Sequence, residues 1–98
     1  MGISVVRVPT ASASRYLQQL AKHWSHHMPV VFSLEEGTVD FPNGCRLEMR
    51  ADGDALGLVL SVPDGQDIAH MRQVVASHLD RFAFREAPLT FDWKVADR

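Results

Sequence analysis

The sequence lacks most features that would assign it to a specialised class of protein. It has one cysteine, Cys45, and therefore no internal disulfide, which is typical of proteins from a reducing cytoplasm. No apolar run approaches the roughly 20 residues that span a bilayer. The first residues lack the charged start, apolar run and cleavage site of a signal peptide. We therefore expect a cytoplasmic protein with no membrane partner.

An excess of charge of one sign is also absent. Ten basic and twelve acidic side chains give a formal net charge of -2, and the two signs are interspersed along the chain. A nucleic-acid-binding domain normally carries a basic face, so we exclude nucleic acid as a partner. The chain also contains no serine nucleophile elbow, glycine-rich phosphate loop or Cys-x-x-Cys pair, which excludes the enzyme classes that depend on these motifs.

What the sequence does contain is a central stretch, from Val30 to Val62, of four short runs in which apolar and polar residues alternate. Turn-forming residues separate the runs at 35–37, 42–44 and 52–54. Side chains alternate between the two faces of a strand, so these runs predict an antiparallel meander with one apolar face. That face needs a covering layer.

A helical pattern lies on each side of this meander. The first runs from Thr10, which we expect to cap the helix, to Met28, because Pro29 ends it. The second begins at Asp64 or Gln66 and ends within residues 84–88. Both have apolar residues three and four apart, which places them on one face of each helix.

Two further strands are predicted outside the helices, at Ile3 to Val8 and at Leu89 to Lys94. The order of elements is β-α-β-β-β-β-α-β. We therefore predict a single domain over residues 1–98 of the α+β class: a two-layer sandwich in which two helices pack on one face of an antiparallel meander sheet.

Several segments of the chain resemble a bacterial family of unknown function, domain-of-unknown-function 2218. They are His78-Leu79-Asp80-Arg81-Phe82-Ala83-Phe84-Arg85-Glu86, Phe91-Asp92-Trp93, Arg15-Tyr16-Leu17, Lys22-His23 and Phe41-Pro42-Asn43-Gly44-Cys45. Similar modules are found alone and also joined to siderophore-interacting reductases. The resemblance therefore implies a link to iron or siderophore metabolism, with such a reductase as a partner.

Histidines are the first residues that could carry chemistry. His23 and His27 lie four apart on the first helix, so their rings can converge on one metal ion. With His78 or Cys45 they would make a set that suits zinc or iron. The alternative is that His23 and His78 form hydrogen bonds with the backbone or with Tyr16, and that His27 is solvated.

Arginines give a second candidate site. Arg81 lies three residues after His78, and Arg85 follows one helical turn later, so the three could form a pocket for a carboxylate or phosphate. The alternative is that both arginines form ion pairs with nearby carboxylates, namely Asp80, Glu86 and Asp92.

These patterns support three functional hypotheses. The first is a non-catalytic binding or accessory module whose ligand-binding residues are Tyr16, His23, His27, His78, Arg81 and Arg85. The second is a protein-interaction domain, monomeric or weakly dimeric, that uses the open sheet face to dimerise or to dock on a reductase. The third is a small enzyme with His23 or His78 as its acid or base; no nucleophile or second carboxylate is placed to help it.

Overall fold

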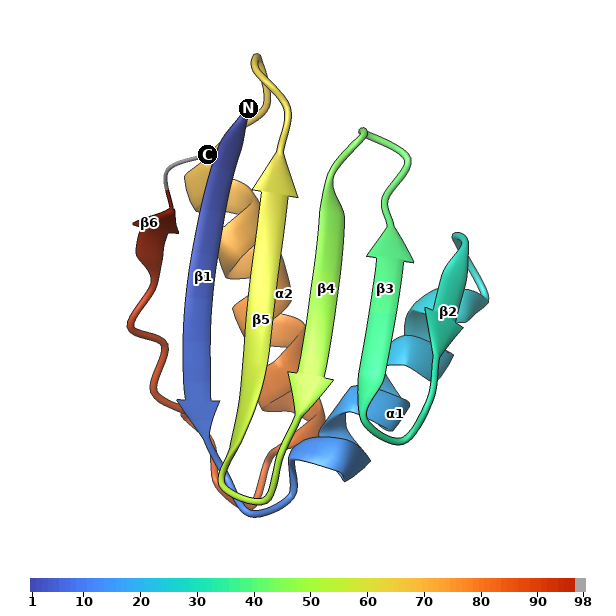
Figure 1. Cartoon of the computed structure of the whole chain (residues 1–98), viewed down its shortest axis with the longest axis vertical. Coiled ribbons are helices and arrows are strands. Elements are labelled where there is room, and N and C mark those ends of the chain that lie inside the picture. The colour runs from blue at the N-terminus through green and yellow to red at the C-terminus, as the bar shows by residue number, and fades with distance from the viewer. Residues whose placement is uncertain (97–98) are drawn as a thin grey trace.

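The computed structural model describes residues 1–96, which form two helices and six strands in the predicted order (Figure 1). The strands are β1 (Gly2–Pro9), β2 (Val30–Phe32), β3 (Glu36–Asp40), β4 (Arg46–Ala51), β5 (Ala55–Val62) and β6 (Lys94–Ala96). The helices are α1 (Ala13–Ser25) and α2 (Ile68–Phe82). The predicted α+β class is confirmed. The last two residues of the predicted 1–98 domain lie outside the described part.

The six strands form one antiparallel sheet in the order β2-β3-β4-β5-β1-β6. The meander predicted from the alternating runs is β2 to β5. The N-terminal strand β1 pairs with β5 along its whole length, with Gly2 opposite Val62 and Pro9 opposite Ala55. The last strand, β6, pairs with β1 through three residues and forms the edge of the sheet.

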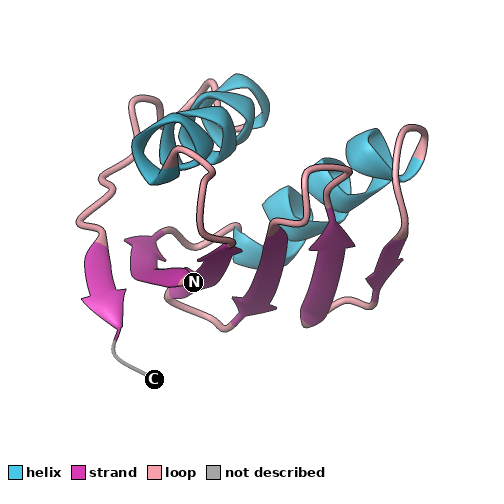
Figure 2. Ribbon diagram, turned by 90° about the horizontal axis from the view of Figure 1, so that it is seen from above, coloured by secondary structure: helices cyan, strands magenta, loops and turns pink. Residues whose placement is uncertain are grey.

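Both helices lie on one face of the sheet and leave the other face open, as Figure 2 shows from above. The core between the two layers consists of the apolar residues that alternate along the strands and recur along the helices. Its largest fully buried side chains are Val8, Leu17, Leu20, Val39, Cys45, Leu47, Leu56, Leu58, Leu60, Val62, Val75 and Leu79. Burying these side chains between the helices and the sheet stabilises the two-layer fold that the alternation in the strands and the three- and four-residue spacing in the helices predict.

The predicted start of the first helix is wrong. Thr10 does not cap α1; Ser12 occupies the N-cap position, and its side chain makes no capping hydrogen bond. The Thr10 hydroxyl is instead buried, where it accepts a hydrogen bond from the Ser12 amide and donates to the Glu86 carboxylate. A long-range partner therefore replaces the local cap that the sequence suggested.

The predicted start of the second helix is also displaced. Asp67, rather than Asp64 or Gln66, is the N-cap, and its carboxylate accepts a hydrogen bond from the His70 amide at 3.1 Å. Asp64 forms an ion pair with the N-terminal amine of Met1. The Asp67 carboxylate therefore caps the positive end of the helix.

The last strand is shorter and later than the alternation predicts. Within the described residues 1–96, only Lys94–Ala96 pair with β1 on this side of the sheet. The preceding segment packs on α2: the rings of Phe91 and Trp93 stack with centroids 6.2 Å apart, and the Arg72 guanidinium lies 5.9 Å from the Trp93 ring centroid. The edge strand β2 is likewise shorter than predicted, and Glu36 and Gly37, expected in a turn, begin β3.

Candidate functional site

The three candidate histidines meet where α1 packs on the C-terminal half of α2, a surface that we call the helix seam. The His23 ring centroid lies 6.0 Å from that of His27 and 5.6 Å from that of His78. Trp24 supports them from the core side, with its ring centroid 5.3 Å from that of His78. The predicted proximity of His23 and His27 is therefore present, and the fold adds His78.

The surroundings of the His23 ring disfavour a positive charge on it. Burial lowers the pKa of His23, and the neighbouring His78, His27 and Arg81 lower it further. One nitrogen of His78 is already occupied, because Nδ1 lies 2.7 Å from the Val74 carbonyl oxygen. A carbonyl only accepts, so Nδ1 carries the proton and donates.

The geometry gives no support to a metal site. Across residues 1–96, no group of three or more histidine, cysteine, aspartate or glutamate side chains is arranged to hold a metal ion. Cys45, the alternative third ligand, is buried in the core, and burial raises the pKa of its thiol. The histidines are brought together as packed rings, which agrees with the hydrogen-bonded alternative for His78.

Tyr16, the next candidate, joins the start of α1 to the segment after α2 in a hydrogen-bonded contact that we call the lock. Its hydroxyl donates to Glu86 Oε2, and the Thr10 hydroxyl lies 3.1 Å from Oε1 and 3.0 Å from Oε2 of the same carboxylate. The hydrogen bond to Glu86 and burial both raise the pKa of Tyr16. The phenol is therefore protonated at neutral pH and acts as a donor.

Beside this lock lies a cavity of about 230 Å³, which we call the arginine pocket. It is lined by Arg15, Tyr16, Gln19, Phe82, Phe84 and Arg85. No ion pair within residues 1–96 involves Arg15, Arg81 or Arg85. The pocket therefore presents two guanidinium groups whose charge no described carboxylate neutralises.

The alternative in which these arginines pair with nearby carboxylates is wrong for the described residues, because no ion pair among them involves Arg81 or Arg85. Each expected partner has other contacts. Glu86 accepts from Tyr16 and Thr10. Asp80 accepts a hydrogen bond from the Leu89 amide at 3.0 Å, and Asp92 pairs with Lys94 at 3.2 Å.

The histidines and the arginine pocket are parts of one surface. Phe82 lines the pocket, and its ring centroid lies 5.6 Å from that of His23. Arg81 does not line the pocket, but its charge acts on His23. Tyr16 and Arg85 of this lining were predicted from the sequence, whereas three others, Arg15, Gln19 and Phe84, were not. The four-residue spacing of Arg15 and Gln19, which flanks Tyr16, was the available signal.

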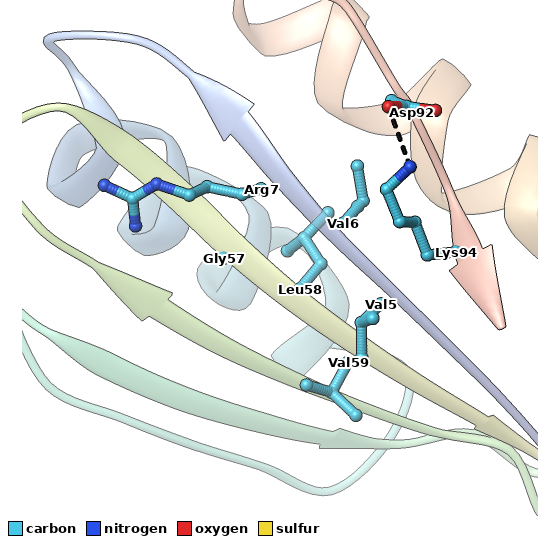
Figure 3. A pocket seen from close by; sticks show the side chains of 8 residues that line it. All are labelled: Val5, Val6, Arg7, Gly57, Leu58, Val59, Asp92 and Lys94. Carbon is cyan, nitrogen blue, oxygen red and sulfur yellow. Dashed lines mark ion pairs between the residues drawn. The ribbon is translucent and has the colours of Figure 1, made fainter. Parts of the chain in front are cut away.

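A second hollow, of about 400 Å³, lies near the edge of the sheet formed by β1 and β6. Figure 3 shows its lining residues, which include Val5 and Val59, opposite each other in paired strands, and Gly57, which lies opposite Arg7. Its charged groups are satisfied locally, since Arg7 pairs with Asp52 and Lys94 with Asp92.

A family model described as "uncharacterized protein conserved in bacteria (DUF2218)" matches residues 5–94. The chain belongs to this family. The resemblance is therefore confirmed. The family description states no activity. A comparison with curated proteins finds no match.

A solved structure supports the fold of this DUF2218 protein. The NMR structure of PA4090 from Pseudomonas aeruginosa is 38% identical in sequence, and the alignment covers 96% of each chain with a TM-score of 0.78. The two-layer arrangement is thus shared with a relative. In the part of the chain that the structure describes, no helix has both the length and the apolar character needed to cross a membrane.

Proposed function

We propose that this chain is a non-catalytic accessory module that binds a small anion in the arginine pocket. The observation that carries the proposal is the contrast between two sets of arginines. On the strands, Arg7, Arg46 and Arg50 each pair with a carboxylate. At the pocket, Arg15 and Arg85 share one cavity and no described carboxylate pairs with either. Guanidinium groups bind carboxylate and phosphate through two parallel hydrogen bonds.

The chemistry around the pocket favours binding over catalysis. Its only acid or base besides the arginines is Tyr16, whose raised pKa keeps the phenol protonated and bound to Glu86. An acid or base must lie within hydrogen-bond reach of the reacting group. Neither His23 nor His78, the residues of the enzyme hypothesis, lines the pocket.

The family resemblance supports a cellular setting for this binding. Modules similar to this one occur joined to siderophore-interacting reductases, so we place the module in bacterial iron or siderophore metabolism, with such a reductase as its partner. A cytoplasmic location is supported by the free thiol of Cys45. Titrating a siderophore-interacting reductase into the labelled module tests the partnership: we expect saturable chemical-shift changes, and their absence at stoichiometric concentrations would remove the reductase from the proposal.

The binding itself is tested by titrating acetate and inorganic phosphate into the protein while recording amide and arginine side-chain resonances. We expect saturable shifts at Arg15 and Arg85 and a loss of affinity of about tenfold in Arg15→Gln and in Arg85→Gln, because a hydrogen bond to a charged group contributes about 1.5 kcal/mol or more. The matched control is Arg46→Gln, an arginine of the open face, which should bind as the unmodified protein does. Shifts that never saturate, or equal losses in all three variants, would contradict the proposal.

A second candidate function is self-association through the open sheet face. It is favoured by the hollow over Gly57 and by Val31, whose side chain on the edge strand β2 is 78% exposed. Light scattering across a dilution series separates the alternatives. A mass that rises with concentration supports a weak homodimer, and a constant monomer mass removes this candidate. Val59→Lys, on the open face, should abolish any dimer.

A further inference from the structure

One residue of the arginine pocket is a large apolar side chain that the core does not cover. Phe84 is 72% exposed, although it lies next to the half-buried Phe82 in the lining of the same cavity. Large apolar side chains that stay exposed at a pocket mark surface that a ligand can cover. The ring therefore belongs to the chemistry of the pocket rather than to the core.

The exposure of Phe84 is built into a fixed turn. The Glu86 and Ala87 amides both donate to the Ala83 carbonyl, at 2.8 and 2.9 Å, and the Ala83 amide donates to the Leu79 carbonyl at 2.9 Å. The Glu86 side chain then anchors the turn to Tyr16 and Thr10. These hydrogen bonds thus fix the backbone on both sides of Phe84.

One of the two positive charges of the pocket, that of Arg85, lies beside the Phe84 ring. The guanidinium carbon of Arg85 lies 5.8 Å from the Phe84 ring centroid, within the range of a cation–π contact. The cavity of about 230 Å³ exceeds the roughly 150 Å³ that holds a benzene molecule in a protein interior. One aromatic ring with one small substituent is therefore of the right size.

We propose that the anion of the arginine pocket is a single-ring aromatic carboxylate. Its carboxylate binds the guanidinium groups of Arg15 and Arg85, and its ring packs on Phe82 and Phe84. The Gln19 amide provides a further hydrogen-bonding group in the lining. This inference rests on the proposed anion-binding function and names the ligand class.

The test is a comparison of benzoate, cyclohexanecarboxylate, acetate and inorganic phosphate by NMR titration of the full chain. Contacts between aromatic rings add a preference of about three- to tenfold beyond the area they bury. We therefore expect benzoate to bind three- to tenfold more tightly than cyclohexanecarboxylate, which has the same charge and a similar size, and to shift the Phe84 ring protons upfield.

The Phe84→Leu variant keeps an apolar side chain and removes the ring. We expect it to lose the preference for benzoate over cyclohexanecarboxylate. The matched control is Phe32→Leu, because Phe32 is an exposed phenylalanine on the edge strand β2, away from the arginine pocket. It should keep the preference.

The possible failures are distinguishable. Equal affinity for benzoate and cyclohexanecarboxylate, or tighter binding of phosphate than of benzoate, would overturn the aromatic ligand and leave anion binding intact. If none of the four anions shifts the resonances of Arg15 and Arg85, the proposed function itself fails. The ring-proton shifts of Phe84 are measured on the unmodified protein, so the test does not depend on the folding of any variant.

Discussion

The hydrogen bond from Tyr16 to Glu86 should contribute measurably to the stability of this small domain. It joins residues 70 positions apart in the chain and fixes the turn that carries Phe84 and Arg85 against α1. Hydrogen bonds to charged groups contribute about 1.5–3 kcal/mol. The lower end applies here, because Glu86 is exposed and water competes for its carboxylate. For a domain of this size, each kcal/mol shifts Tm by about 4–8 °C, so we expect Tyr16→Phe to lower Tm by about 6–12 °C.

A double-mutant cycle separates this bond from the general effect of altering either residue. The free energy of unfolding is measured by urea denaturation for Tyr16→Phe, Glu86→Ala and the double variant. We expect the double variant to be more stable than the sum of the single losses implies, by about 1 kcal/mol. The control, Asp92→Ala, removes an exposed ion pair and should cost less than about 0.5 kcal/mol. Additivity within about 0.3 kcal/mol would refute the reasoning, because two groups that share a bond cannot act independently.

Three further outcomes are expected. Tyr16 is the only tyrosine, so the rise in tyrosinate absorbance at alkaline pH reports its titration; its midpoint should lie above the ordinary pKa of 10.0 and fall in Glu86→Gln. NMR titration should place the pKa of His23 below 6.5. Because the unfolded chain then binds the proton more readily than the folded chain, the free energy of unfolding should decline as pH falls from about 6.5. The decline should be less steep in His23→Gln, and equal slopes of unfolding free energy against pH would contradict this. Leu79→Ala, at a fully buried position facing the sheet, should cost about 2–5 kcal/mol by urea denaturation, and a loss below 1 kcal/mol would contradict the packing described.

The architecture was predictable because local patterns determine it. The alternation through Val62 and the helical spacing around Leu17 and Leu79 report which side of each element is buried, and burial is the dominant force in folding. The order of strands was not predictable, because the pairing of β1 with β5 joins segments about 50 residues apart. The same limit explains the misplaced last strand: Phe91 and Trp93 alternate as strand residues do, yet they pack on a helix.

The candidate site was predictable only where its residues lie close together in the sequence. His23 lies in the last turn of α1, and His27 lies just beyond the helix, which ends at Ser25 rather than at Met28 as predicted; the hydrogen bond from the His27 amide to the Trp24 carbonyl keeps the two rings close, with centroids 6.0 Å apart. His78 reaches them only through the packing of α2 on α1. Thr10 shows the converse: its sequence context indicates a local cap, but a carboxylate 76 residues away offers its hydroxyl a buried partner.

The pairing of charges explains why the arginine pocket could not be predicted from the sequence. On the open face, Arg46 lies directly opposite Asp40 and Arg50 opposite Glu36 in adjacent strands, so the register itself supplies each partner. At the helix seam the nearest carboxylate in sequence, Glu86, is taken by the hydroxyls of Tyr16 and Thr10. These hydrogen bonds hold the Glu86 carboxylate against Tyr16 and Thr10, and within residues 1–96 no ion pair joins it to Arg85. Breaking the lock with Tyr16→Phe should therefore release Glu86 toward the arginines and weaken anion binding, a result that links the stability of the turn to the function of the pocket.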